Sequence, residues 1–178
     1  MEDNESLKYI ENEFKDLHNT GIPQLNITIG KEEDDPYTWI ITMLGPKDTL
    51  YAGGLFYLKV KFPTNYPNSP PTILFITPIY HINVNHLYKE GCKLGNVFLS
   101  ALKYWKKEYR MRGILPNVYA LFYLSNTENY YGEDRLKEMQ NNHDLFSEKI
   151  KYFTSKYTSP DEDYIQYINW NFNYYKNF

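Results

Sequence analysis

The sequence contains a single cysteine, Cys92, among its 178 residues. No internal disulfide can therefore form, and no second thiolate is available for a cysteine-rich zinc site. The sequence also lacks any run of about 18 apolar residues, the minimum for a membrane-spanning helix. Its acidic first five residues do not resemble a secretory signal. We expect a protein of a reducing compartment, the cytoplasm or the nucleus, with no membrane partner.

An excess of basic residues is also missing. Lys and Arg number 19 against 22 Asp and Glu, and the pI is about 5.8, so we expect no nucleic-acid partner. A short basic and aromatic run from Lys103 to Arg112 is expected to form a solvated loop or a protein contact. Hydrophobic residues at 42% and charged residues at 23% are ordinary for a globular chain of one domain.

Hydrophobic periodicity predicts a helix followed by strands in the first half of the chain. Apolar residues at helical spacing from Leu7 to Leu17 predict an amphipathic helix, with Ser6 as its N-cap and Gly21 at its end. Alternating apolar residues then predict strands. These cover about 25–29, 39–43, 56–62 and 72–76. The links between them are short and polar, which favours an antiparallel meander.

A long loop and further helices are predicted for the second half. Periodicity fades over 78–112, and loops of this length in a compact domain are usually functional. Helical patterns return at 114–122, where Pro116 would occupy the first turn, and over 134–153.

The sequence Ser-Pro-Asp-Glu at 159–162 predicts the start of one more helix, which is rich in Tyr, Trp and Phe. We therefore predict a single α+β core over residues 1–158, with an aromatic-rich helix, 159–178, appended to it.

Two motifs in this order resemble the ubiquitin-conjugating enzyme family. GPKDTLYAGGLF at 45–56 matches the family pattern G-P-x-x-[ST]-x-Y-x-G-G-x-F, and FPTNYPNSPP at 62–71 matches F-P-x-x-Y-P-x-x-P-P. Glycines permit a tight crossing where a strand leaves the sheet, and prolines hold an extended segment. The resemblance implies the ubiquitin-conjugating-enzyme fold and a place in ubiquitin or ubiquitin-like conjugation.

The resemblance also implies which residues would perform catalysis. In this family a cysteine thiolate carries ubiquitin as a thioester, and the Asn of a His-Pro-Asn triplet steadies the oxyanion when a lysine attacks. Here the triplet is His81-Ile82-Asn83. Cys92 lies eleven residues after His81, close to the usual interval. In this interpretation Cys92 is the nucleophile, Asn83 stabilises the oxyanion and His81 supports the loop.

A second alignment gives a different result. The family pattern around the nucleophile is G-x-[IV]-C-[LIV]-x-x-L, whereas Cys92 is flanked by Gly91 and Lys93. The sequence GNVFLSAL at 95–102 fits the pattern better and places Phe98 at the nucleophile position. Phenylalanine cannot form a thioester, and this alignment resembles the cysteine-less variants of the family, the UEVs. It requires an insertion before Phe98, which costs little chain entropy.

Three functions remain open from the sequence. The favoured one is a UEV-like module that binds ubiquitin or an active conjugating enzyme without catalysis. The alternative is a divergent conjugating enzyme that accepts ubiquitin at Cys92 from an activating enzyme. The third is an interaction scaffold without ubiquitin contact. We expect no cofactor, and no metal because His81, His86 and Cys92 lack a fourth ligand nearby.

Two departures from the family concern ligases. Lys106-Lys107-Glu108 follow Trp105, where the family usually has Ser-Pro-Ala, and Asn68-Ser69 replace an apolar residue between two prolines. Both changes argue against ordinary ligase docking. Glu133 and Asp134 lie near the family's acidic residue, but acids are favoured at any helix start.

Overall fold

The computed structural model describes residues 2–86 and 93–158. Its centre is a four-stranded antiparallel sheet in the order β1-β2-β3-β4. The strands are β1 (Ile27–Lys31), β2 (Thr38–Leu44), β3 (Leu55–Lys61) and β4 (Thr72–Phe75). Each strand pairs with the next one along the chain. This is the meander that the sequence predicts.

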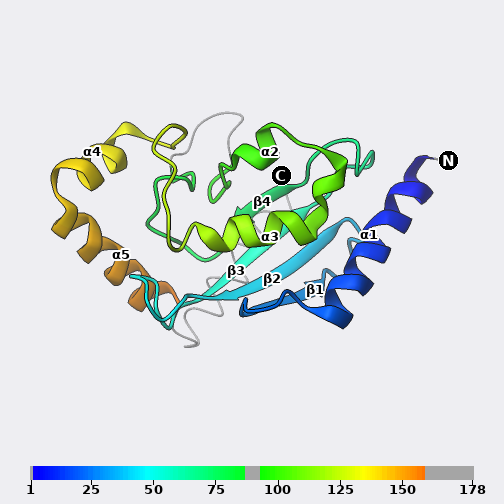
Figure 1. Ribbon diagram of the computed structural model, residues 1–178, viewed down its shortest axis with the longest axis horizontal. Coiled ribbons are helices and arrows are strands. Elements are labelled where there is room, and N and C mark those ends of the chain that lie inside the picture. The colour runs from blue at the N-terminus through cyan, green and yellow to red at the C-terminus, as the bar shows by residue number, and fades with distance from the viewer. Residues whose placement is uncertain (1, 87–92, 159–178) are drawn as a thin grey trace.

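Helices surround the sheet (Figure 1). They are α1 (Glu2–Thr20), the short α2 (Ser100–Lys103), the 3-10 turn η1 (Lys107–Tyr109), α3 (Arg110–Ala120), α4 (Glu133–Asn141) and α5 (His143–Tyr157). Figure 1 shows α3 crossing the middle of the molecule, with α1 at one end and α4 and α5 at the other. No helix of the described residues has the length and apolar character needed to span a membrane.

The core lies between the sheet and α3. Strand alternation brings Trp39, Ile41 and Met43 of β2 to one face, opposite Val60, Leu58 and Phe56 of β3. All six side chains are fully buried. They belong to the same apolar cluster as Ile114, Leu115 and Val118 of α3. The predicted periods of two in the strands and of about 3.6 in the helix therefore identify the core.

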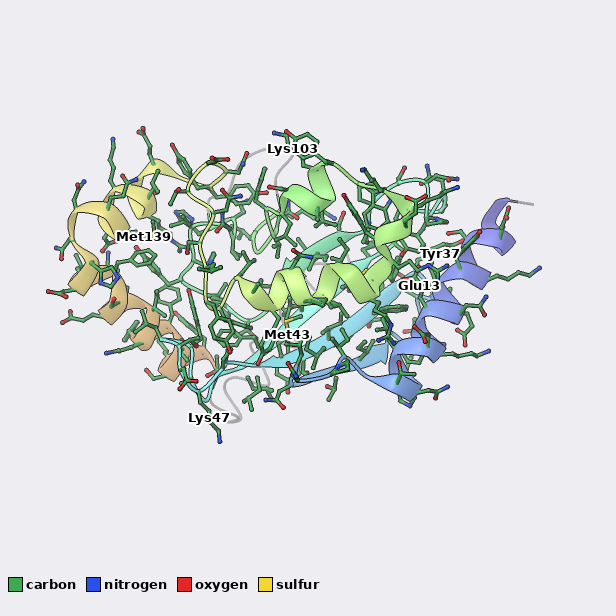
Figure 2. All side chains as sticks on the ribbon, in the orientation of Figure 1. Glu13, Tyr37, Met43, Lys47, Lys103 and Met139 are labelled. Carbon is green, nitrogen blue, oxygen red and sulfur yellow. The ribbon has the colours of Figure 1, made fainter. Side chains whose placement is uncertain are left out.

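A buried carboxylate joins α1 to this core. Glu13 is labelled in Figure 2 on α1, and only 7% of it is exposed. Its Oε1 accepts a hydrogen bond from the Tyr66 hydroxyl at 2.8 Å, and its Oε2 accepts one from the Met111 amide at 2.8 Å. Burial raises the pKa of Glu13 despite these two donors. The apolar stripe of α1 gave no indication of this polar link.

Gly45 of the first motif makes a close crossing after β2. A Cβ at this position would lie 1.9 Å from the Tyr51 carbonyl oxygen, so no other residue fits without movement of the backbone. The Gly45 amide donates to the Gly54 carbonyl at 2.8 Å. The motif thus closes a loop that brings Tyr51 against the sheet.

Three local predictions are wrong. Ser6 does not cap α1, because the helix begins at Glu2 and the Ser6 hydroxyl instead donates to the Pro63 carbonyl at 3.4 Å. Pro116 lies inside α3 rather than in its first turn, because that helix begins at Arg110. The single helix predicted over 134–153 is two helices, since Asn142 leaves the helical conformation and its side chain caps α5 by accepting from Leu145.

The predicted last helix, 159–178, lies outside the described residues, so the proposed boundary between it and the core at 158/159 stays a prediction. The predicted loop over 78–112 is largely irregular, but it contains α2, η1 and the start of α3. An isolated β-bridge between Leu74 and Asn96 joins its backbone to β4, and a second, between Val84 and Val97, joins two parts of the loop itself.

Candidate functional site

His81 is buried and both of its ring nitrogens have partners. Its Nε2 lies 3.0 Å from the Leu121 carbonyl oxygen, and its Nδ1 accepts a hydrogen bond from the Asn83 amide at 3.0 Å. The tautomer with hydrogen on Nε2 satisfies both contacts. Burial lowers the pKa of His81 to about 4, so the ring is neutral near pH 7. The neutral His81 ring therefore links the backbone at Leu121 to the backbone at Asn83.

The side chain of Asn83 connects two loops. Its Nδ2 donates to the carbonyl oxygens of Asn126, at 2.8 Å, and Asn129, at 2.5 Å. Its Oδ1 accepts from the Asn126 amide at 2.8 Å. Because a carboxamide nitrogen carries two hydrogens, both donors of Asn83 are already used. Asn83 is fully buried, so water does not replace these partners.

Phe98 lies directly beside this triplet. Its amide donates to the Asn83 carbonyl at 2.8 Å, and α2 begins two residues later. The Phe98 ring is half-buried and makes an edge contact with Tyr131, at a centroid distance of 6.2 Å. The Lys103 ammonium is 5.9 Å from the Phe98 ring centroid. The fold therefore brings His81, Asn83 and Phe98 together.

Gly95 fixes the path of the chain into Phe98. It has a φ of +76°, and a Cβ there would lie 2.1 Å from the Phe75 carbonyl oxygen. The Gly95 carbonyl accepts from the Phe75 amide at 2.8 Å, and its amide donates to the Asn85 carbonyl at 2.8 Å. Only glycine meets both the conformation and the close approach to β4.

Cys92 lies outside the described residues. The chain enters the undescribed segment 87–92 after His86 and leaves it at Lys93. The Lys93 carbonyl accepts a hydrogen bond from Asn85 Nδ2 at 2.9 Å, so the residue after Cys92 is tied to the loop that carries Asn83.

Comparison with known proteins now identifies the group to which this chain belongs. A family model described as ubiquitin-conjugating enzyme matches residues 9–154. The chain belongs to the ubiquitin-conjugating enzyme family. The predicted α+β fold of that family is confirmed, with its N-terminal helix, antiparallel sheet and C-terminal helices.

Two curated relatives match about two thirds of this chain and 70–76% of their own length. Ubiquitin-conjugating enzyme E2 14 of Schizosaccharomyces pombe is 36% identical over 118 residues, which is 65% of this chain and 70% of the relative. Ubiquitin-conjugating enzyme E2 13 of Arabidopsis thaliana is 32% identical over 127 residues, 67% of this chain and 76% of the relative. The family membership implies partners in the ubiquitin pathway.

Sequence reasoning missed the loop that faces the family triplet. The segment 125–131 supplies partners to all of the site: the Ser125 hydroxyl is 3.4 Å from His81 Nε2, and the Asn126 and Asn129 backbone groups bond to Asn83. The Tyr131 hydroxyl accepts from Asn96 Nδ2 at 3.0 Å. The signal in the sequence was the polar run Ser-Asn-Thr-Glu-Asn, because such residues bond to nearby backbone in loops.

The acidic residues at the start of α4 each have a basic partner. Glu133 pairs with Lys137 one turn later, at 3.1 Å. Asp134 Oδ2 lies 3.3 Å from His86 Nε2. Within residues 2–86 and 93–158, no group of three His, Cys, Asp or Glu side chains gathers in a way that could hold a metal.

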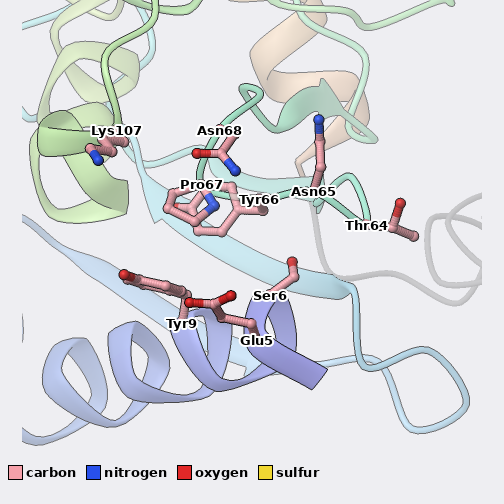
Figure 3. Close-up of a pocket in the computed structure, with 9 residues that line it drawn as sticks. All are labelled: Glu5, Ser6, Tyr9, Thr64, Asn65, Tyr66, Pro67, Asn68 and Lys107. Atoms are coloured by element: carbon pink, nitrogen blue, oxygen red, sulfur yellow. The ribbon is translucent and has the colours of Figure 1, made fainter. Parts of the chain in front are cut away.

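A separate polar pocket of about 270 Å³ lies between α1 and the proline-rich segment after β3 (Figure 3). Its lining includes Glu5, Asn65, Asn68 and Lys107. Trp105 holds one wall, since its Nε1 donates to the Pro67 carbonyl at 2.8 Å. Both sequence departures that concern ligases thus lie on one surface, and its lining is mainly polar.

Proposed function

We propose that this protein is a UEV-like member of the ubiquitin-conjugating enzyme family, which binds ubiquitin or an active conjugating enzyme without carrying a thioester. The observation that carries the proposal is the placement of Phe98 next to Asn83, three residues after Gly95. The family pattern has glycine, two residues, and then the cysteine. Gly95 is required by its own backbone geometry, which supports the alignment that gives Phe98 the nucleophile position.

The hydrogen bonds of Asn83 support the same proposal. Stabilising an oxyanion needs a donor aimed at the reacting carbonyl. Both hydrogens on Asn83 Nδ2 are donated to backbone carbonyls of the facing loop. Asn83 would therefore have to break one of these bonds to act on a substrate. We infer that its role is to join the two loops and that His81 supports the same loops.

Two observations favour the alternative of a divergent enzyme. Both curated relatives are named as ubiquitin-conjugating enzymes, and Lys93, the neighbour of Cys92, is tied to Asn85. In this alternative the Cys92 thiolate attacks the thioester on the activating enzyme, takes over the ubiquitin acyl group and releases that enzyme's thiolate. The acyl group then passes to a lysine amine.

Thioester charging separates the two proposals. Purified full-length protein and Cys92→Ser are incubated with activating enzyme, ATP and ubiquitin, and then resolved with and without reductant. We expect no adduct from either protein, beside a known conjugating enzyme that charges. A reductant-sensitive adduct that disappears in Cys92→Ser would overturn the UEV-like proposal and establish the enzyme.

Binding measurements test the positive part of the proposal. We expect ¹⁵N-labelled ubiquitin, or a labelled active conjugating enzyme, to show saturable shifts when this protein is added. Absence of binding to both, with no charging, would instead favour a scaffold without ubiquitin contact. For ligases, the mainly polar pocket between α1 and the proline-rich segment predicts weak docking, and Asn68→Phe tests whether an apolar side chain restores it.

A further inference from the structure

A second cavity, of about 290 Å³, lies between the end of β4 and the two C-terminal helices. Gly95 and His86 line it but Asn83 and Phe98 do not, so it adjoins the Asn83 site, and it is separate from the polar pocket of Figure 3. Side chains that line it and bear on its chemistry are Ile79, Val84, His86, Leu94, Arg135 and Phe153. The volume is near the lower end for pockets that hold small molecules.

Arg135 is the only one of these residues with a permanent charge, and it is buried. Only 6% of it is exposed, although arginine is almost never fully buried without a partner. Its Nη1 donates to the carbonyl oxygens of Ile79, at 3.5 Å, and His81, at 3.3 Å, both long contacts. Its guanidinium stacks over Tyr80 at 4.2 Å.

No carboxylate of the described chain, residues 2–86 and 93–158, lies within 4 Å of the Arg135 guanidinium. A guanidinium presents five N–H donors in a planar fork that matches a carboxylate. Uncompensated burial of such a charge is costly. An anionic ligand in the cavity would provide the missing counter-ion.

His86 supplies an independent unsatisfied group in the same cavity. Its Nε2 faces Asp134, which can only accept, so Nε2 carries the hydrogen. Its Nδ1 is buried and forms no well-aligned hydrogen bond among the described residues, although the Val84 backbone lies close enough to the ring to oppose the lowering of its pKa. Burial and the nearby Arg135 charge lower the pKa of His86. An anion that offsets the Arg135 charge would favour a proton on Nδ1, which could then donate to that anion.

The remaining walls limit the kind of anion. Ile79, Val84, Leu94 and Phe153 present apolar surface, which suits a hydrocarbon stem. Asp134 stands beside His86, and Glu138 accepts from the Tyr80 hydroxyl under the guanidinium. These two carboxylates oppose a ligand with more than one negative charge.

We propose that this cavity binds a single carboxylate carried on an apolar stem, with the Arg135 guanidinium as its counter-ion. Two sources share this chemistry: a free short-chain carboxylic acid and the C-terminal carboxylate of a polypeptide. The site requires neither Cys92 nor the placement of Phe98, so it goes beyond the function proposed above.

The test is a titration of ¹⁵N-labelled full-length protein followed by NMR. N-acetylleucine stands for a polypeptide C-terminus and butyrate for a free acid. N-acetylleucinamide has nearly the same shape without charge, and inorganic phosphate has charge without a stem. We expect saturable shifts at His86, Gly95 and Arg135 with at least one carboxylate. We expect binding of the amide and of phosphate to be weaker by about tenfold or more.

Two variants test the counter-ion. Arg135→Met keeps a stem of similar length and removes the charge, and it should reduce carboxylate binding by about tenfold or more. Lys137→Met removes a charge from the exposed side of the same helix and should leave binding unchanged. Circular dichroism checks that both variants are folded.

Three results of these titrations would overturn the proposal. Equal binding of N-acetylleucine and its amide would mean that only apolar contact is involved. Equal binding of phosphate would mean general attraction to positive charge. Absence of shifts with both carboxylates would mean that Arg135 is buried for structural reasons alone. The acid and amide comparison uses the unmodified chain, so it stands even if Arg135→Met fails to fold. Which acid binds more tightly distinguishes the two sources.

Discussion

The sheet and the loops around Asn83 are held together by different forces. Between β2, β3 and α3 the contacts are apolar, and Trp39, Ile41 and Phe56 are fully buried. Around Asn83 the buried groups are polar, and each bonds to a specific backbone atom of another loop. Both regions exclude water, but the first does so mainly with apolar atoms, and its Trp39 indole N–H is buried with no hydrogen-bond partner among the described residues.

The difference explains which region can change without loss of the fold. Apolar packing depends on volume and on the face that a residue occupies, so many side chains are acceptable there. A buried polar network requires particular atoms, because an unpaired group in a low-dielectric interior is costly. A member of this family can therefore keep its loop structure through Asn83 whether or not a nucleophile stands beside it.

The largest effect is expected from a cavity in the apolar region. Phe56→Ala removes a ring that packs within 5.0 Å of Phe122, between ring centroids, and within 6.2 Å of Phe75. We expect the free energy of unfolding to fall by about 3–5 kcal/mol. Urea unfolding followed by circular dichroism measures it. Tyr104→Ala, at a residue that is 66% exposed, should change stability by less than about 0.5 kcal/mol. Similar losses in both variants would contradict this description of the core.

Acid should weaken the polar region through His81. The pKa of His81 is about 4 in the folded protein, below its ordinary value of about 6.5, so the unfolded chain takes up a proton first. The contribution of neutral His81 to the free energy of unfolding is therefore fully present above about pH 6.5, and it is lost as the pH falls toward 4. The loss approaches about 3 kcal/mol.

Urea midpoints across this pH range test the assignment. In His81→Gln the urea midpoint should change less between about pH 6.5 and 4 than it does in the unmodified protein. In His143→Gln, at an exposed histidine of α5, the midpoint should change as it does in the unmodified protein. An unchanged pH dependence in His81→Gln would rule out His81 as its source.

Asn83→Ala should have an intermediate effect. It leaves the Asn126 amide and two carbonyl oxygens without their partner, which we expect to cost about 1–3 kcal/mol. Amide hydrogen exchange at Asn126 should accelerate more than exchange in β2. Asn83→Asp keeps the acceptor but loses both donors, so it should protect Asn126 better than alanine does. Uniform acceleration across the sheet would argue against a local role.

The smallest effect concerns a single hydrogen bond that joins the two regions. The Tyr51 hydroxyl donates to the Tyr80 carbonyl at 2.9 Å, while the Tyr51 ring belongs to the apolar core. Tyr51→Phe removes the bond and retains the ring, so we expect a loss of about 1 kcal/mol in thermal or urea unfolding. A loss as large as that of Phe56→Ala would mean that the ring itself had moved.

Predictions from the sequence succeeded where a regular pattern decides structure. The alternation in β2 and β3 predicted their buried faces, and the two family motifs predicted the fold. Prediction failed where a tertiary contact overrode a local rule. Ser6 has the chemistry of an N-cap, but the helix continues past it and its hydroxyl bonds to Pro63. Asn142 divides a helix whose apolar pattern continues across the break.

The candidate site was only partly accessible to sequence reasoning. The triplet with His81 and Asn83 could be found from its resemblance to the family's His-Pro-Asn pattern, because that pattern is short and local. Its partners Leu121, Asn126 and Asn129 lie about 40 residues or more away in the chain, and no periodicity links such distant positions. The sequence allows two alignments of the nucleophile position, and the backbone path through Gly95 beside Asn83 supports our proposal that Phe98 occupies it.

By itself, the sequence determined the antiparallel order of the strands, the buried faces of β2 and β3 and, through two motifs, the resemblance to the family. These follow from side-chain periodicity and from glycines and prolines, whose effects on the backbone are local. Only the tertiary structure decided that both donors of Asn83 are occupied, that Glu13 joins α1 to α3, and that the buried Arg135 has no carboxylate of the described residues within 4 Å. Burial and hydrogen-bond partners are properties of the packed chain, because both depend on residues that come together only when it folds.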